Sequence, residues 1–157
     1  PLGIIKAAVK ANENQKINTA KKIIEHYKNL IQSKPTLSVL GLSFKPNTDD
    51  MRESPSLKII EELHNSGFNL KVHDPVCIEN AKDMVHKDIK LCSDLIEAVE
   101  DSDGIVLVTE WNDYRALNFI ELGKIMNKKI LFDLRNIYNP HQIRKYGFEY
   151  IGIGKKL

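Results

Sequence analysis

Cysteine, metal-binding spacings and long apolar runs are scarce in this sequence. Its 157 residues contain two cysteines, Cys77 and Cys92, and no C-x-x-C pair, so neither a disulfide framework nor a zinc site is expected. The five histidines show no H-x-x-x-H spacing, and we expect no bound metal. No apolar run approaches the roughly 20 residues of a membrane span, and no signal peptide is visible. These absences favour a reducing, cytoplasmic setting.

The charge balance also excludes some partners. The net charge of +2 is too small to indicate nucleic acid or a membrane surface as a partner. With 42% hydrophobic and 28% charged residues, the chain should form an ordinary core. It begins with Pro1 and lacks an initiator methionine, so we expect it to be a piece of a longer protein.

Residues 3–33 contain no internal glycine or proline and predict one long helix. Polar residues at 12–16 precede its apolar stripe, which comprises Ile17, Ala20, Ile24, Tyr27 and Ile31. A helix of this length spans about 45 Å, more than a domain of this size needs for its own core. Two interpretations stay open: packing on its own domain, or a connector that contacts another subunit.

Strand and helix patterns alternate after the break at residues 33–35. Apolar runs predict strands at 36–42, 68–72, 89–92, 105–108, 130–134 and 148–153. Helices are expected after the caps Ser54 and Asn139, over 76–86, after Ser93, and over 119–126. This alternation predicts an α/β fold: a Rossmann-like three-layer sandwich with a mostly parallel sheet, preceded by the long helix.

Cationic side chains follow the predicted strands on one edge of this sheet. Phe44 and Lys45 come after the first strand, Arg52 lies further along the same loop, and Arg135 follows the fifth strand. Because parallel strands share one carboxyl edge, the three cations are placed to meet one anionic ligand such as a diphosphate. Alternatively, each is a solvated surface charge. The phosphate-binding G-x-G-x-x-G is missing after the first strand, so side chains would have to hold the phosphates.

Other reactive side chains have weaker support. Cys77 falls near a predicted helix start, which lowers a thiol pKa, but no base lies beside it, and we expect both thiols to be inert. His73 precedes Asp74 at a strand end, although a core histidine is the favoured interpretation. Trp111 and Tyr114 are suited to stacking on a base, but packing in the core is favoured.

Acidic residues at 49, 50 and 53 are open to two interpretations. They suggest a metal site or the phosphorylation pocket of a receiver-type module, but no aspartate directly follows the third strand, as a receiver requires. The favoured interpretation is that they pair with Lys45 and Arg52 and order the loop.

Several motifs carry a resemblance to a known family. The run V-L-G-L-S-F-K-P-N-T-D-D-M-R-E-S-P-S, at 39–56, is followed in order by V-H-D-P-V, T-E-W-N-D-Y-R and L-F-D-L-R-N. Together they resemble the C-terminal, UDP-binding domain of the UDP-glucose/GDP-mannose dehydrogenases. The A-V-K-A-N-E-N-Q of the first helix resembles the end of that family's middle, dimer-forming domain. Thr-Glu-Trp at 109–111, in place of Thr-Glu-His, resembles the UDP-glucose 6-dehydrogenase branch.

The resemblance implies an activity and a division of labour. The family oxidises the C6 alcohol of a nucleotide sugar to a carboxylate in two NAD-dependent steps, through a covalent cysteine intermediate. By motif, Phe44, Lys45 and Arg135 bind the UDP-sugar, with Arg135 contributed across a dimer, and Arg52 reaches the NAD pyrophosphate. Residues 1–33 would end the middle domain and pair in a homodimer, and residues 35–157 would bind the UDP-sugar.

The chain also departs from the family. The G-x-G-x-x-G of its NAD-binding domain and its catalytic G-G-x-C-x-P-K-D motif are both absent. We therefore expect no catalytic residue here and no turnover by this chain alone. Two alternatives remain: dehydrogenation of UDP-N-acetylmannosamine or GDP-mannose by the whole enzyme, or a non-catalytic dimerisation module.

Overall fold

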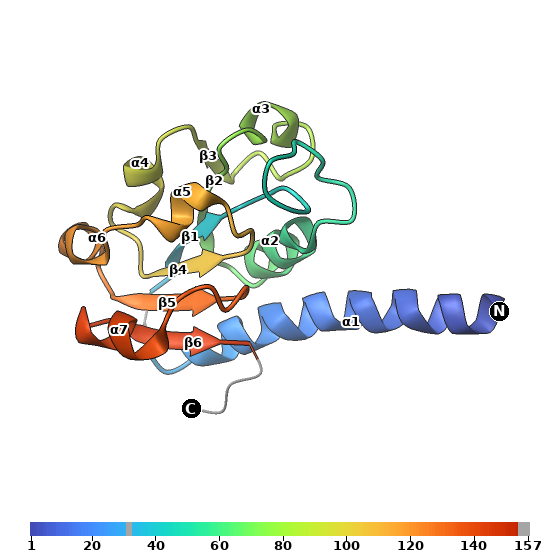
Figure 1. Ribbon diagram of the computed structural model, residues 1–157, viewed down its shortest axis with the longest axis horizontal. Helices are drawn as coiled ribbons and strands as arrows, with labels where there is room; N and C mark the ends of the chain where they lie inside the picture. The colour runs from blue at the N-terminus through green and yellow to red at the C-terminus, as the bar shows by residue number, and fades with distance from the viewer. Residues whose placement is uncertain (31–32, 154–157) are drawn as a thin grey trace.

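A parallel sheet forms the centre of the protein (Figure 1). The computed structural model describes residues 1–30 and 33–153. Its strands are β1 (Thr36–Leu40), β2 (Asn69–His73), β3 (Lys90–Cys92), β4 (Gly104–Leu107), β5 (Ile130–Asp133) and β6 (Glu149–Gly152). Its helices are α1 (Leu2–Tyr27), α2 (Pro55–Asn65), α3 (Ile78–Ala81), α4 (Leu95–Val99), α5 (Asn112–Arg115), α6 (Phe119–Ile125) and α7 (Pro140–Lys145).

The strand order identifies the architecture. Within the described residues the sheet runs β3-β2-β1-β4-β5-β6, and every neighbouring pair is parallel. This is the Rossmann order, in which the chain winds outward from β1 to one edge and from β4 to the other. The predicted fold class is confirmed. The receiver alternative is wrong, because receivers of the CheY type have the order 2-1-3-4-5.

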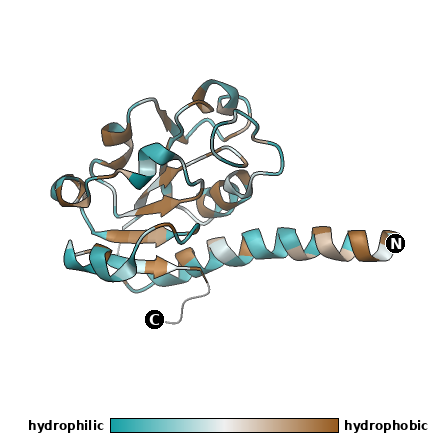
Figure 2. Cartoon of the chain, viewed as in Figure 1, coloured by the Kyte–Doolittle hydropathy of each residue, from teal (hydrophilic) through white to brown (hydrophobic). Residues whose placement is uncertain are grey.

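Two apolar layers cover the two faces of the sheet. Residues of β4 alternate between them: Val106 packs with α1, α2 and α3, whereas Ile105 and Leu107 pack with α5, α6 and α7. The strands are accordingly rich in apolar residues, which are coloured brown in Figure 2. The predicted three-layer sandwich follows from this burial of both faces.

The fully buried residues of helix α1 all lie in its last third. Ala20, Ile23 and Tyr27 are buried, and the Tyr27 hydroxyl donates to the carbonyl of Asp103 at 2.7 Å. A Cβ on Gly104 would lie 2.2 Å from that hydroxyl, so glycine is required beneath it. The amino-terminal half extends past the α/β core (Figure 1).

The predicted stripe of α1 needs correction. Ile23 is buried where Ile24 was expected, and Ile17 is only partly buried. The helix ends at Tyr27, not at residue 33, and Ile31 lies outside the described residues. No helix among residues 1–30 and 33–153 has both the length and the apolar character needed to cross a bilayer.

The remaining elements agree with prediction except at particular ends. Ser54 and Asn139 cap α2 and α7 as expected, each followed by proline. The helix predicted over 76–86 is only the single turn α3, because residues 82–84 are exposed and supply no buried face. Asp94, not Ser93, caps α4, since its carboxylate accepts the Glu97 amide at 3.0 Å. Helix α5 was not predicted.

Candidate functional site

The loop after β1 is fixed by a buried carboxylate from the neighbouring strand. Asp74, which follows β2 and is buried, accepts the backbone amides of Leu42 and Ser43 at 2.8 and 3.2 Å. Its other oxygen accepts the amides of Val76 and Cys77, each at 2.9 Å. One side chain therefore ties together the ends of two strands at the carboxyl edge of the sheet.

Side chains that follow β4 complete this attachment. The Thr109 hydroxyl donates to the carbonyl of Ser43 at 2.8 Å, and the Trp111 indole N–H donates to the Ser43 hydroxyl at 3.2 Å. Gly41 has a φ of +102°, and a Cβ there would lie 2.6 Å from the Thr109 backbone nitrogen. The strands β1 and β4 flank the point where the winding direction reverses, which is where ligands bind in such sheets. The loop is thus held rigidly at the crevice.

Residues 44–53 form a compact polar turn beyond this anchor. The Phe44 amide donates to the Asp50 carbonyl at 2.8 Å and closes the turn. The Asp50 carboxylate accepts two bonds from the Arg52 guanidinium, at 3.1 and 3.2 Å, and these bonds hold the pKa of Asp50 below its usual value. Arg52 nevertheless has 85% of its side chain exposed. Of the pairings expected for the acidic residues, that of Asp50 with Arg52 is present and the guanidinium remains open to solvent. The pairing expected for Lys45 is not found among the described residues.

Phe44 and Arg135 line one pocket of about 250 Å³ at this edge. Its walls come from Phe44 after β1, Val108 after β4 and Arg135 after β5, with the start of α2 beside them. Phe44 is 51% exposed, an unusual environment for a phenyl ring, so it offers an apolar contact to a ligand. The pocket combines one aromatic face with one guanidinium.

The guanidinium of Arg135 is held by Glu110. Arg135 donates two hydrogen bonds to the Glu110 carboxylate, the one from Nη2 at 3.0 Å and the other from Nε. Burial tends to raise the pKa of Glu110, but these bonds outweigh it and hold that pKa below its usual value. The Arg135 backbone is fixed as well, because its amide donates to Asp133 at 3.2 Å.

Of the four residues predicted for ligand binding, two lie in one pocket and two lie next to it. Phe44 and Arg135 share the 250 Å³ pocket, and Arg52 adjoins it through a shallow hollow that Phe44 also lines. Lys45 is exposed beside Phe44. Within residues 1–30 and 33–153, neither a hydrogen bond nor an ion pair holds its ammonium group. Two of the three cations are therefore paired with carboxylates, and Lys45 carries the unpaired charge.

The loop after β1 and the residues around it lie within a segment that matches a known protein family. The model of the UDP-glucose/GDP-mannose dehydrogenase family's UDP binding domain matches residues 38–140. The chain belongs to the UDP-glucose/GDP-mannose dehydrogenase family.

Relatives of known sequence and structure support the assignment. A UDP-glucose 6-dehydrogenase of Rhizobium meliloti is 37% identical over 99% of this chain and 35% of its own length. One of Rickettsia conorii is 34% identical over 98% of this chain and 36% of its own length. The chain thus spans about a third of the curated relatives it matches.

Solved structures of family members show the same fold. A UDP-glucose dehydrogenase from Pyrobaculum islandicum matches with a TM-score of 0.77 at 26% identity, covering 98% of this chain and 33% of its own. A UDP-N-acetyl-D-mannosamine dehydrogenase from Pyrococcus horikoshii has the same TM-score at 32% identity, covering 97% of this chain and 34% of its own.

Helix α1 contributes pocket residues that the sequence reasoning missed. Asn12, Gln15, Lys16 and Thr19 line the same pocket as Phe44 and Arg135. The signal was present, because residues 12–16 interrupt the apolar stripe of the helix with polar side chains. That interruption marks the part of α1 that lines the pocket with Phe44 and Arg135.

The other candidate residues are structural. Burial raises the pKa of the Cys77 thiol to about 12, with nearby Asp74 adding to the effect, so the expected lowering at a helix start is wrong and the thiol is inert. Burial likewise raises the pKa of Cys92 and lowers that of His73. Because Tyr114 donates its hydroxyl to the His73 carbonyl at 3.0 Å, its oxygen accepts from His73 Nδ1 at 2.9 Å.

The aromatic residues after β4 are also part of the scaffold. Trp111 and Tyr114 are buried in the cluster that covers the β4–β5 side of the sheet. The prediction that they pack in the core is confirmed. Trp111 therefore supports the family motif from beneath, through its bond to Ser43.

Proposed function

We propose that this chain is the UDP-sugar-binding part of an NAD-dependent UDP-glucose 6-dehydrogenase. The observation that carries the proposal is the pocket that Phe44 and Arg135 share at the carboxyl edge of the sheet, beside the unpaired Lys45. Its position at the reversal of winding is the one that nucleotides use in this architecture. The whole enzyme would convert UDP-glucose to UDP-glucuronate, and residues outside this chain would supply the catalytic cysteine.

Each residue has a role that suits its chemistry. Lys45 would meet the diphosphate as a mobile point charge, and Phe44 would pack against the apolar surface of the nucleotide sugar. Arg135 would bind an oxygen pair of the substrate by exchanging its bonds with Glu110 for bonds to the ligand. Arg52, largely exposed, would reach the pyrophosphate of NAD, which binds mainly to a domain outside this chain.

The long helix suggests how this part joins the rest. Residues 1–33 would end the middle domain, and residues 35–157 would form the UDP-sugar-binding domain. The projecting half of α1 exposes Leu2, Ile4, Ile5 and Val9, which gives it an apolar face for the rest of that domain and for a second copy (Figure 2). A homodimer is therefore part of the proposal, and the two free, buried thiols are suited to a reducing cytoplasm.

A sister activity on UDP-N-acetylmannosamine or GDP-mannose is the competing proposal. The relative from Pyrococcus horikoshii is a UDP-N-acetyl-D-mannosamine dehydrogenase, and the GDP-mannose dehydrogenase from Pseudomonas aeruginosa matches with a TM-score of 0.64 at 27% identity. The Thr-Glu-Trp motif discriminates weakly, since Trp111 is buried under the loop. A comparison of UDP with GDP binding separates the uridine from the guanosine substrates.

Calorimetric titration with UDP tests the nucleotide site. We expect this chain to bind UDP, and Lys45→Ala to weaken binding at least about tenfold, since a charge-assisted hydrogen bond contributes about 1.5–3 kcal/mol. Lys145→Ala is the matched control, because that lysine is exposed at the far end of α7, away from the pocket.

Three results would count against parts of the proposal. Equal UDP affinities for Lys45→Ala and Lys145→Ala would remove Lys45 from the site. Tighter binding of GDP than of UDP would favour the guanosine branch. Reduction of NAD by this chain alone with UDP-glucose would overturn the assignment of catalysis to residues outside it.

A further inference from the structure

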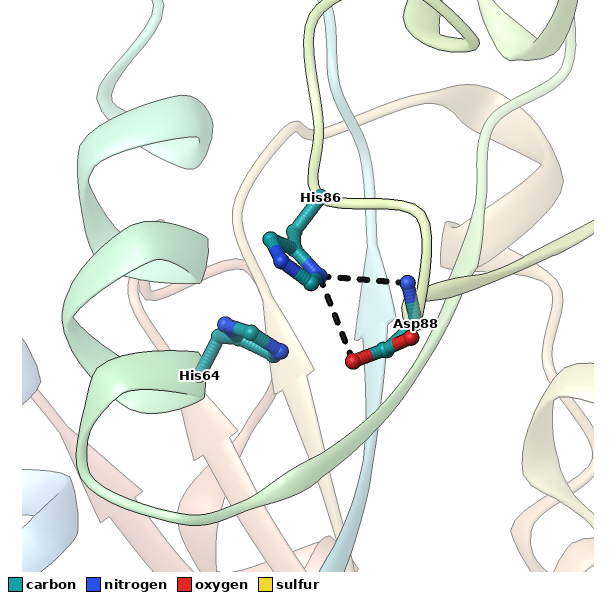
Figure 3. Close-up of side chains that lie close together, drawn as sticks. All are labelled: His64, His86 and Asp88. Carbon is teal, nitrogen blue, oxygen red and sulfur yellow. Dashed lines mark hydrogen bonds and ion pairs between the residues drawn. The ribbon is translucent and has the colours of Figure 1, made fainter.

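A second site emerges away from the nucleotide pocket, where three metal-ligating side chains converge (Figure 3). His64 lies in the last turn of α2, and His86 and Asp88 lie in the segment between α3 and β3. One ligand atom from each residue lies within 4.8 Å of the other two. Since 22 and 24 residues separate His64 from the other two in sequence, only the fold brings them together.

The two imidazole rings and the carboxylate lie against one another. The rings of His64 and His86 are stacked, with centroids 4.4 Å apart and an interplanar angle of 29°. The Asp88 carboxylate lies 3.5 Å from Nδ1 of His86, which also accepts the Asp88 amide at 3.2 Å. That hydrogen bond uses the lone pair of Nδ1, so an ion bound at Nδ1 would take the place of the Asp88 amide.

To bind one ion together, the three ligand atoms have to move closer to one another. Two ligand atoms about 2.1 Å from one zinc ion in tetrahedral geometry lie about 3.4 Å apart, so the widest separation here has to shorten by about 1.4 Å. The side chains of His86 and Asp88 are about half and two-thirds exposed, so rotation about their side-chain bonds is unobstructed by a packed core. An exposed site also gives the ion direct access from solvent.

We propose that His64, His86 and Asp88 form a binding site for a divalent transition-metal ion of the zinc class. Two imidazoles and one carboxylate are the ligands that zinc accepts in three-residue sites, with water in the fourth position. The ion fastens the end of α2 to the segment before β3, whose residues 82–88 form no regular helix or strand. Because α2 begins directly after the nucleotide-binding loop, the metal stabilises the element on which that loop ends.

Titration of the tag-free chain with ZnCl₂ in a non-chelating buffer at about pH 7.5 tests the site, since neutral imidazoles are required. We expect one zinc ion per chain and a raised melting temperature, because a ligand that binds only the folded state stabilises it. His64→Asn, His86→Asn and Asp88→Asn should each weaken binding at least about tenfold. Co²⁺ substitution should give the visible absorption of a four-coordinate site.

His141→Asn is the matched control, because His141 is exposed on α7 and has no part in the cluster. It should bind zinc as the unchanged chain does, and both cysteines are buried and do not compete while the chain is folded. The proposal is overturned if the unchanged chain takes up no zinc. It is equally overturned if His64→Asn and His86→Asn bind zinc as tightly as His141→Asn. Circular dichroism of each variant separates loss of the site from loss of the fold.

Discussion

Asp74 ties the ends of β1 and β2 together at the carboxyl edge of the sheet. Its two carboxylate oxygens accept four backbone amides, from Leu42 and Ser43 on one side and from Val76 and Cys77 on the other. Asp74→Asn keeps the shape of the side chain but replaces one oxygen by an amide nitrogen. Whichever way the new side chain turns, one pair of amides faces a donor and loses its acceptor.

The cost follows from those two orphaned amides. A buried donor left without an acceptor costs about 1–3 kcal/mol, so the variant should lose about 2–6 kcal/mol of its free energy of unfolding. A loss near 3 kcal/mol would lower the melting temperature by about 6–12 °C for a chain of this size. Urea unfolding gives the free energy directly, and amide hydrogen exchange should rise first at Leu42, Ser43, Val76 and Cys77.

The matched control is Asp83→Asn, an equal change on an exposed aspartate of the segment after α3. It should alter the free energy of unfolding by less than about 0.5 kcal/mol. If Asp74→Asn lowered the free energy of unfolding by less than about 1 kcal/mol, the four hydrogen bonds of this carboxylate would not be what links β1 to β2.

Two further predictions concern titratable groups near the same edge. Burial raises the pKa of Cys77 to about 12. Iodoacetamide at about pH 8 should therefore modify this thiol at least about tenfold more slowly in the folded chain than in urea, as measured by mass spectrometry. Equal rates of modification would contradict the burial of Cys77. The lowered pKa of Glu110 means that its pair with Arg135 stabilises the fold while the carboxylate is ionised, and that this stability is lost as the pH falls from about 4.5 through the lowered value. Glu110→Gln should therefore cost up to about 1 kcal/mol at pH 7 and nothing near pH 2 in urea unfolding, and an undiminished cost at the lower pH would refute the pairing.

Local sequence signals predicted the elements of this fold well. Two helix starts were predicted from Ser54 before Pro55 and from Asn139 before Pro140. The capping oxygen and the fixed φ of proline favour a helix start through neighbouring residues alone, so the sequence is enough to predict them. Ends that depend on tertiary burial were predicted less well. The segment after Ala81 has helix-forming residues but no surface to cover, so it turns after four helical residues.

The candidate site divides along the same line. Phe44, Lys45, Arg52 and Arg135 stood out because each follows a strand or belongs to a family motif. The polar face of α1 escaped notice because its partners follow β1, β4 and β5, far away in the sequence. The cluster of His64, His86 and Asp88 was unpredictable from spacing for the same reason, and the expectation of no metal rested on spacing alone.

The pairing of its arginines with carboxylates gives the carboxyl edge of the sheet a particular electrostatic character. Arg52 and Arg135 are each bound by a carboxylate, Asp50 and Glu110, so their guanidinium groups are oriented without a ligand. A phosphate that replaces such a carboxylate exchanges one anionic partner for another. The ligand then spends little free energy on ordering these side chains, a form of preorganisation.

Under the proposed function, the same pairing would let a nearly neutral chain hold a dianion. The charge of the two arginines is balanced until a ligand displaces the carboxylates, and Lys45 supplies the one unpaired cation among the residues proposed to bind the nucleotide. Attraction at a distance should therefore be weak and should depend on Lys45, whereas the fit of a bound diphosphate depends on the arginines. Under the proposed function, removal of Lys45 slows association, and loss of either arginine speeds dissociation.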